Sequence, residues 1–336
     1  MTQHHLLSNL PSAPSDHTGW PWTKETPALP DTMPNGEAWP RISIVTPSFN
    51  QGQFLEETIR SILLQGYPNL EYIIIDGGST DESVEIIKKY EPWLTYWVSE
   101  KDRGQVHAIN KGLERCTGEI FNWINSDDLL TLGALRTIAE AFKDVDVVAG
   151  GCIHFSESGE KDCFYCANLS ASSLIRNEGR GKKRRIFQQP PFWIRINNLL
   201  DCGGIDEQFH YAFDWDLAIR YLSLSPNIAY LHSGLARFRL HPASKTVSEN
   251  AKFAEERILI LEKLQHLKGF EPLQKDCNHS LRLTRWRQML DSIKHEQQTD
   301  KLPRVIRIAK LSCQDPVIRW SRKTLGSIIR VFKPKS

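Results

Sequence analysis

The chain has 336 residues, which is enough for one large domain or two smaller ones. Hydrophobic residues make up 40% of the sequence and charged residues 24%, a globular composition that argues against a fibrous or disordered chain. The net charge of +2 is too small to indicate a nucleic-acid partner. We therefore expect a globular protein that binds no nucleic acid.

Cysteine usage and hydropathy indicate the compartment. Seven irregularly spaced cysteines do not resemble the disulfide framework of a secreted protein. Cys163 and Cys166 form a single C-x-x-C pair without a second pair or nearby histidines, so we expect free thiols rather than a zinc or redox site. The first residues lack the regions of a signal peptide, and no apolar run approaches the roughly 20 residues that span a bilayer. These features predict a cytoplasmic protein.

Residues 1–40 are rich in Pro, Ser and Thr and predict an extended N-terminal arm that lies on the following domain. From residue 41 to 150, strand and helix patterns alternate. Apolar, β-branched runs predict strands at 42–46, 72–75, 94–99, 120–124 and 146–150, with amphipathic helices between them. Such alternation is typical of βαβ units, so we predict an α/β fold with a mainly parallel sheet flanked by helices.

The fourth of these strands runs directly into two adjacent acids, Asp127 and Asp128. A buried parallel strand that ends in this way delivers charge to the carboxyl edge of the sheet, where ligands bind in open α/β folds. Adjacent carboxylates repel each other unless a cation lies beside them, and a divalent metal is the usual one. Right-handed crossovers place the ends of the other strands on the same edge, and these ends add Pro47, Asp76 and Asp102. The alternative is that such acids only form turns and helix caps.

Residues 151–247 lack the clear alternation and contain two notable segments. Asp214 and Asp216 lie two apart in a helical pattern, so one can face a cleft while the other caps the helix or pairs with Arg220. The basic loop 178–185 is either solvated or a lid that closes on a diphosphate.

Residues 248–336 predict a helical C-terminal extension with a basic tail at 303–336. Apolar residues at helical spacing lie among the tail's cations, at Leu325, Ile328, Ile329 and Phe332. A basic amphipathic helix of this kind is a candidate for peripheral contact with an anionic membrane, and packing on the catalytic domain is the alternative.

Several common motifs are absent. After the first strand there is no G-x-G-x-x-G dinucleotide fingerprint, and the chain contains neither a phosphate loop nor a G-x-S-x-G elbow. What remains is an acid-lined rim suited to a metal-bound diphosphate.

Four successive segments carry a resemblance to a known family. Residues 43–50, 75–81, 99–105 and 123–128 resemble the motifs of family-2 glycosyltransferases with the GT-A fold, and the similarity runs from about residue 41 to 245. The resemblance implies a nucleotide-sugar donor linked to UDP, GDP or dTDP, a saccharide or lipid-linked acceptor, Mg²⁺ or Mn²⁺, and inversion at the anomeric carbon.

The resemblance also implies roles for individual residues. It assigns donor binding to Thr46, Pro47, Asn50, Asp76, Asp102, Arg103, Gln105 and Asp127. It assigns the metal to Asp127, Asp128 and His241, and the general base to Asp214. The chain departs from the family at Gly77, Asn125 and Phe213, where acids are common, so the number of metal ligands is left open. As alternatives, Asp214 is a structural helix-start acid and His241 an ordinary histidine.

The resulting prediction is a metal-dependent inverting glycosyltransferase of surface polysaccharide or cell-envelope glycan synthesis. Its domains would be the arm 1–40, a GT-A catalytic domain 41–247 with a donor half 41–150 and an acceptor half 151–247, and the extension 248–336. One alternative is a sugar nucleotidyltransferase, which attacks phosphorus and has no need of Asp214. The other is a non-catalytic protein that binds sugar nucleotides or glycans.

Overall fold

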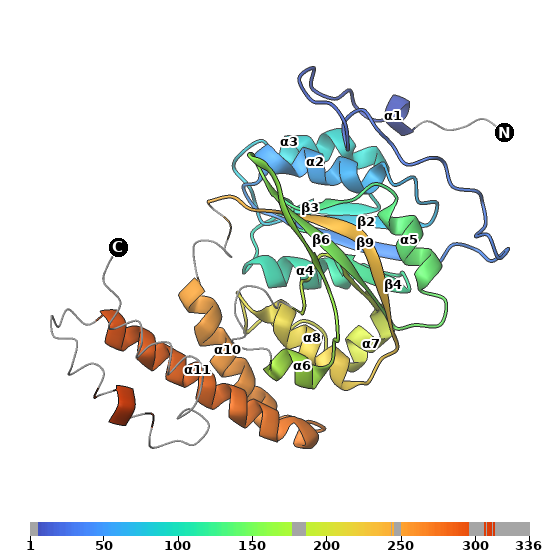
Figure 1. Ribbon diagram of the computed structural model, residues 1–336. Coiled ribbons are helices and arrows are strands. Elements are labelled where there is room, and N and C mark those ends of the chain that lie inside the picture. The colour runs from blue at the N-terminus through green and yellow to red at the C-terminus, as the bar shows by residue number, and fades with distance from the viewer. Residues whose placement is uncertain are drawn as a thin grey trace. The chain divides into compact units, whose positions relative to one another are not determined.

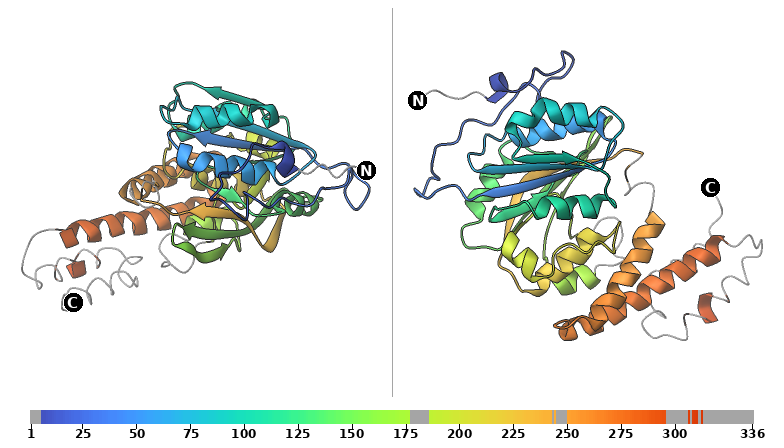
Figure 2. Two further views of the ribbon diagram at one scale, coloured as in Figure 1. Left: turned by 90° about the horizontal axis from the view of Figure 1, so that it is seen from above. Right: turned by 180° about the vertical axis from the view of Figure 1, so that it is seen from behind.

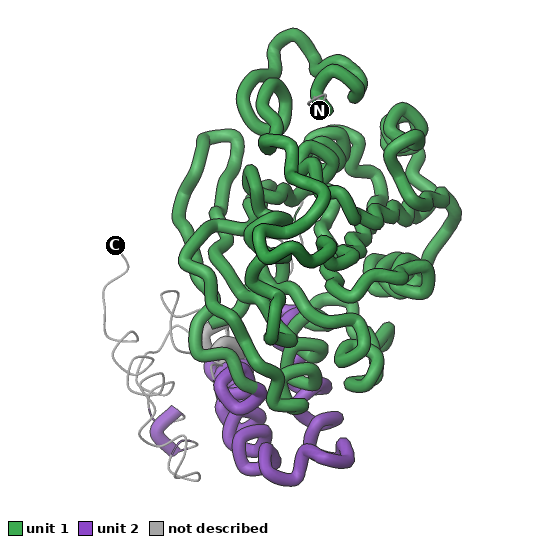
Figure 3. Tube along the Cα trace, turned by 90° about the vertical axis from the view of Figure 1, so that its right-hand side faces the viewer, with its two compact units in different colours: residues 1–170, 185–248 green, residues 171–184, 249–336 purple. Residues whose placement is uncertain are grey.

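The structure is a computed structural model that describes residues 6–176, 186–242, 244, 250–295, 306, 308–310 and 312. The chain forms two compact units: residues 1–170 with 185–248, and residues 171–184 with 249–336 (Figure 3). The predicted basic loop 178–185 and most of the basic tail 303–336 lie outside the described residues. Within the described part of the chain, no helix has both the length and the apolar character needed to cross a membrane.

The first unit is built on one curled sheet, which confirms the predicted α/β fold. Its strands are β1 (Ile42–Ser48), β2 (Leu70–Asp76), β3 (Tyr96–Ser99), β4 (Ile120–Trp123), β5 (Leu129–Leu130), β6 (Val147–Ser156), β7 (Gly159–Tyr165), β8 (Phe192–Arg195) and β9 (Ile228–Arg239). They lie in the order β3-β2-β1-β4-β8-β6-β9-β5, and β7 pairs with β6. Strands β1 to β4 are mutually parallel, whereas β8 is antiparallel to both of its neighbours, so β6 and β9 again run in the direction of β1.

Helices cover both faces of this sheet. They are α1 (Leu6–Asn9), α2 (Gly52–Leu63), α3 (Ser83–Tyr90), α4 (Gln105–Leu113), α5 (Ala134–Ala141), α7 (Ile196–Asp201) and α8 (Phe213–Ser223). Helices α2 and α3 lie on one face of β1 and β2, and α4 lies on the other (Figures 1 and 2). On the α4 side the packing is close, because a Cβ on Gly112 would lie 2.5 Å from Cγ1 of Val45. Apolar side chains buried fully in these layers contribute about 1.5–3 kcal/mol each to stability.

The N-terminal arm is fastened to α2 by one buried cation. Arg60 is 1% exposed, and its guanidinium lies 5.3 Å from the ring centroid of Trp22. It donates hydrogen bonds to the carbonyls of Pro11, Pro21 and Trp22 and to the hydroxyl of Tyr90.

The second unit is helical in its described residues. It contains α6 (Ala171–Arg176), α10 (Asn250–His266), a 3₁₀ turn at Glu271–Leu273 and α11 (Gln274–His295). Asp276 of α11 accepts hydrogen bonds from Arg176 and Ser172 of α6, each at 2.6 Å.

The parallel register determines which loops meet in the first unit. It aligns Ser48 with Asp76 and Asp76 with Ser99, so the loops after β1, β2 and β3 are neighbours at one edge of the sheet. The loop after β4 leads into β5, which pairs with β9 through Leu129 and Arg237. The end of β9 is therefore brought to the acidic loop 124–128.

Candidate active site

The buried carboxylate of Asp128 holds the acidic loop, residues 124–128, in place. Asp128 is 1% exposed, its Oδ1 accepts the backbone N–H of Arg239 at 3.0 Å, and its Oδ2 accepts Nδ2 of Asn125 at 3.1 Å. Burial and the neighbouring carboxylate of Asp127 raise the pKa of Asp128 well above its usual range. Asp128 therefore ties the loop to β9, and the carboxylate that reaches the surface is that of Asp127. The expected contact of Asp128 with a metal stays a prediction.

Asp127 meets His241, which lies just beyond β9. Oδ2 of Asp127 and Nε2 of His241 are 3.0 Å apart, and the side chains are 20% and 12% exposed. The ring of Phe54, from the first turn of α2, lies 4.9 Å from the imidazole ring and limits its movement. The structure thus brings together two of the three residues expected to bind metal, from parts of the chain far apart in sequence.

These two side chains fit a divalent cation. Two ligands at right angles around an octahedral ion, each at about 2.1 Å, are about 3.0 Å apart, as the oxygen and nitrogen are here. Among the described residues, no group of three or more His, Cys, Asp or Glu side chains could hold a metal. Sites that use one or two protein ligands and complete the shell with substrate phosphates and water are common for Mg²⁺. That Asp127 and His241 supply the protein's share of the ligands stays a prediction.

Three expected donor-binding residues lie beneath the rim and shape it. Thr46 and Pro47 are buried, and Oγ1 of Thr46 lies 3.1 Å from the hydroxyl oxygen of Tyr72. Asp76 has no exposed surface, and its carboxylate accepts the N–H groups of Gly78 and Ser79 and the hydroxyls of Ser79 and Ser99. Contact of these three residues with a nucleotide stays a prediction, because in this structure they hold the loops that would make it.

The exposed part of this rim is formed by Phe49 and Asn50. Asn50 has a positive φ of 51°, which suits asparagine better than most residues. Its Oδ1 accepts the N–H of Thr80 at 2.9 Å, so the loops after β1 and β2 are joined. The side chain of Phe49 is 58% exposed beside them. Phe49 was not among the residues predicted from the sequence, although an aromatic residue directly after the Thr-Pro-Ser end of a strand could have indicated it.

Family members commonly have an acid at the position of Gly77. In this structure the side chain of Asp102 occupies the space that such an acid would need. A Cβ on Gly77 would be only 2.7 Å from Oδ2 of Asp102, so glycine makes room for this side chain. Oδ1 of Asp102 accepts the N–H of Gly104 at 2.8 Å. The next expected residue, Gln105, donates from Nε2 to Oδ1 of Asn125 at 2.7 Å and so connects α4 to the acidic loop.

The two acids at the start of α8 have different environments, as the helical spacing predicted. Asp216 has no exposed surface, and its Oδ2 lies 2.8 Å from Nε and 2.7 Å from Nη2 of Arg220. Asp214 is partly exposed. The ring of Phe213 lies 5.8 Å from that of Trp123, the last residue of β4, which places the beginning of α8 beside the strand that leads into the acidic loop.

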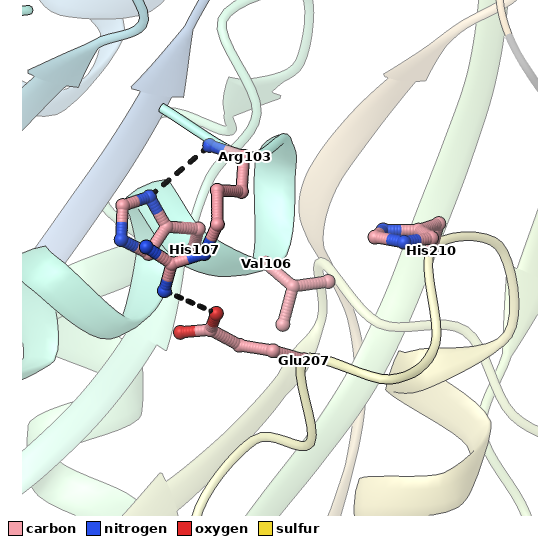
Figure 4. Close-up of a pocket in the computed structure, with 5 residues that line it drawn as sticks. All are labelled: Arg103, Val106, His107, Glu207 and His210. Atoms are coloured by element: carbon pink, nitrogen blue, oxygen red, sulfur yellow. Dashed lines mark hydrogen bonds and ion pairs between the residues drawn. The ribbon is translucent and has the colours of Figure 1, made fainter. Parts of the chain in front are cut away.

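A pocket of about 280 Å³ lies between the beginning of α4 and the loop that leads into α8 (Figure 4). Its lining residues are Arg103, Val106, His107, Glu207 and His210. Arg103 spans the pocket, with Nη2 at 2.7 Å from Oε2 of Glu207, and this hydrogen bond lowers the pKa of Glu207. Asn110 supports the same carboxylate, with Nδ2 at 3.3 Å from Oε1.

The sequence analysis missed several residues of this region. Glu207 and His210 follow a Gly-Gly turn in a stretch without clear periodicity, so nothing in the pattern indicated that they face α4. Nor did the sequence indicate that Arg239 and Glu57 belong to this region. Contacts between segments more than a hundred residues apart, such as Arg103 to Glu207, leave no local signal.

Comparison with known proteins identifies the family. Residues 43–203 match the family described as glycosyl transferase family 2. The chain is 34% identical over 219 residues to the glycosyltransferase GlyG of Streptococcus pneumoniae serotype 4, covering 60% of this chain and 72% of that protein. It is 37% identical over 92 residues to TuaG of Bacillus subtilis, a putative teichuronic acid biosynthesis glycosyltransferase, covering 26% of this chain and 36% of that protein.

The fold is shared with solved structures. The S. aureus protein TarS, residues 1–349 in complex with UDP-GlcNAc, superimposes with a TM-score of 0.58 at 14% identity, over 87% of this chain and 89% of that one. This likeness confirms the predicted GT-A architecture. The match to GlyG and the family match set aside the sugar nucleotidyltransferase alternative. The chain belongs to glycosyltransferase family 2 and is a glycosyltransferase.

Proposed function

We propose that this glycosyltransferase transfers a sugar from a nucleotide-sugar donor to a saccharide or lipid-linked acceptor, with inversion, in the synthesis of a surface glycan. The observation that carries the proposal is the pair formed by Asp127 and His241, 3.0 Å apart at the carboxyl edge of the sheet. The relatives support it, since TuaG is described as a putative teichuronic acid biosynthesis glycosyltransferase and TarS has been solved with UDP-GlcNAc.

The donor would lie across the ends of β1 to β4. Phe49 presents an exposed ring on which a nucleobase can stack, because every base has a flat π-face. Asp102 and Gln105 lie at the beginning of α4, where the partial positive charge of the helix favours a diphosphate. Asp127 and His241 would hold Mg²⁺ or Mn²⁺, which when bound offsets the negative charge on the departing nucleoside diphosphate.

Asp214 would act as the general base. An acceptor hydroxyl is a poor nucleophile, and a carboxylate within hydrogen-bond reach can take its proton during attack. Asp216 is sealed by Arg220, so Asp214 is the acid of this helix that an acceptor can meet. The acceptor oxygen bonds to the anomeric carbon as the bond to the diphosphate breaks, and the proton passes to Asp214. Attack from the face opposite the leaving group inverts the anomeric carbon.

The pocket between Arg103 and His210 would receive the acceptor. It offers hydrogen-bond donors, a carboxylate acceptor and the apolar side chain of Val106, a mixture that suits a neutral sugar ring. His210 lies four residues before Asp214, and its Nδ1 lies 3.9 Å from where a Cβ on Gly104 would project. A sugar in this pocket would therefore lie between the donor-side loop and the base.

A thermal-shift screen tests the proposal. We expect one of the UDP-, GDP- or dTDP-sugars to raise the melting temperature in the presence of Mn²⁺, because a bound ligand stabilises the folded state by mass action. Asp127→Asn should abolish the part of the shift that depends on Mn²⁺. If no nucleotide sugar stabilises the wild-type protein with or without Mn²⁺, the proposed donor site is wrong.

A further inference from the structure

Cations and aromatic rings alternate along one side of the end of β9. Arg237 and Arg239 lie two residues apart in β9, so their side chains point to the same side of the strand, and His241 follows two residues after its end. The guanidinium of Arg237 lies 4.6 Å from the ring centroid of Phe155, and that of Arg239 lies 4.4 Å from Phe155 and 4.6 Å from Phe54. Phe54 in turn contacts His241, with the ring centroids 4.9 Å apart. We call these five residues the β9 ladder.

Arg239, at the centre of the β9 ladder, also binds the acidic loop. Its Nε donates to the carbonyl oxygen of Asp127 at 2.9 Å, and its backbone N–H donates to Oδ1 of Asp128 at 3.0 Å. Nη2 lies 2.6 Å from Oε2 of Glu57 in α2, so the guanidinium joins β9, α2 and the loop. The side chain is only 12% exposed. Two rings, a carboxylate and a carbonyl therefore fix this group.

We propose that Arg239 is a positioning residue that fixes the main chain at Asp127 and thereby sets the Asp127 carboxylate against His241. The planar guanidinium is suited to this task, because it can stack between two rings while its N–H groups reach acceptors at its edge. A lysine ammonium is a compact charge on a flexible stem and cannot hold both contacts in one plane. The inference rests on the proposed function only in assigning Asp127 and His241 to metal and diphosphate.

Arg237 provides a matched control. It lies on the same strand and stacks on the same Phe155 ring, but its guanidinium pairs with Glu160 at 3.3 Å. Arg237→Met and Arg239→Met therefore remove the same group from the same ladder. They differ in what else is lost: Arg237→Met loses the pair with Glu160, whereas Arg239→Met loses the stack on Phe54, the pair with Glu57 and the bond to the carbonyl oxygen of Asp127.

Hydrogen exchange of the full chain without ligand measures the positioning directly. The backbone N–H of Asp128 donates to the carbonyl oxygen of Asn125 at 3.0 Å, so it reports whether the loop is closed. We expect Arg239→Met to speed exchange in residues 124–130 by at least about tenfold, because a hydrogen bond from a charged donor is lost there. Arg239→Lys should recover part of the protection. Arg237→Met should match the wild type.

A second readout is the Mn²⁺ dependence of UDP, GDP and dTDP binding. Loss of a group that orients a metal ligand typically lowers metal affinity by about 10- to 100-fold, and we expect this for Arg239→Met but not for Arg237→Met. Because Arg239→Met leaves Glu57 without its partner, the double variant Arg239→Met/Glu57→Gln removes that charge if the single variant fails to fold.

The inference is overturned if loop exchange in the folded Arg239 variant stays within about twofold of the wild type, or if exchange rises equally in β1 and β2, which would indicate general destabilisation. If the loop opens as expected but the wild type binds no nucleotide, the positioning role stands and the proposed function fails.

Discussion

Oδ2 of Asp127 and Nε2 of His241 lie 3.0 Å apart although 114 residues separate them in the chain. The sheet brings them together, because β4 leads into the loop that carries Asp127, and β9, paired with β5, ends just before His241. A ligand at this edge can thus contact residues from both halves of the first unit.

Substitutions of the two acids of α8 should have different effects, one on catalysis and the other on stability. Asp214→Asn should lower the turnover number by about 10²- to 10⁴-fold, the usual contribution of a general base, and leave donor affinity and the melting temperature unchanged. Steady-state kinetics and a donor titration measure the two quantities. Equal turnover in Asp214→Asn and wild type would exclude the proposed base.

Asp216→Asn is the matched variant two residues away. Asp216 forms a fully buried ion pair with Arg220, and breaking such a pair from one side costs about 3–5 kcal/mol of unfolding free energy. We expect a clearly lower midpoint of urea unfolding for Asp216→Asn. An unchanged midpoint would show that the pair does not stabilise the start of α8.

Removal of the Arg60 guanidinium should loosen the N-terminal arm. Arg60→Met leaves the buried carbonyls of Pro11, Pro21 and Trp22 without a donor, and each unsatisfied buried group costs about 1–3 kcal/mol. Arg136→Met is the control, because Arg136 forms only an exposed pair with Glu140 on α5 and such pairs contribute about 0–1 kcal/mol. Urea unfolding and limited proteolysis of residues 10–40 measure the difference. Similar stability in both variants would contradict the clamping role.

Stability should fall in acid partly because of Glu71. Burial would raise the pKa of this carboxyl, but hydrogen bonds from Ser43 and Thr117 outweigh it and the pKa lies below the ordinary 4.5. A carboxyl whose pKa is lower in the folded state stabilises the protein above its unfolded pKa, and this contribution is lost as the pH falls through the folded pKa. Glu71→Gln should therefore lower stability at pH 7 and show a smaller further loss below about pH 4. If the stability of the wild type and of Glu71→Gln fell in parallel as the pH is lowered, Glu71 would not contribute to the loss of stability in acid.

A substitution in the pocket should change the KM for the acceptor and leave hydrolysis of the donor unchanged. Glu207→Gln keeps the shape of the side chain but removes the charge that Arg103 faces at 2.7 Å. We expect a higher KM for a saccharide acceptor, with donor hydrolysis unchanged. Little loss of stability should follow, because the pair is exposed and such pairs contribute about 0–1 kcal/mol. An unchanged acceptor KM would place the acceptor elsewhere.

The sequence predicted the donor half of the fold because its signals are local. The apolar runs of β1 to β4 and the helices between them follow from periodicity, and right-handed crossovers then determine the shared edge. The insertion of β8 between β4 and β6 was not predictable, since it depends on pairing between distant segments that periodicity does not specify.

The site was predicted less completely than the fold. The family resemblance assigns Asp76 to the donor and Asp128 to the metal, and both roles stay predictions. Their burial by hydrogen bonds from their own loop or from β9 had no local signal in the sequence. Arg237 and Arg239 look alike in the sequence, and only the three-dimensional contact with Asp127 distinguishes them. The pairing of Asp216 with Arg220, in contrast, follows from their i,i+4 spacing and was one of the two roles, helix cap or ion pair, that the sequence offered for an acid here.

Calorimetric titration of Mn²⁺ into the protein saturated with UDP, GDP or dTDP tests the central claim most directly. We expect one Mn²⁺ site in the wild type with at least one nucleotide, and affinity lowered by about 10- to 100-fold or more in both Asp127→Asn and His241→Ala. Equal Mn²⁺ affinity in the wild type and both variants would show that the ion, and with it the diphosphate, is not held by this pair.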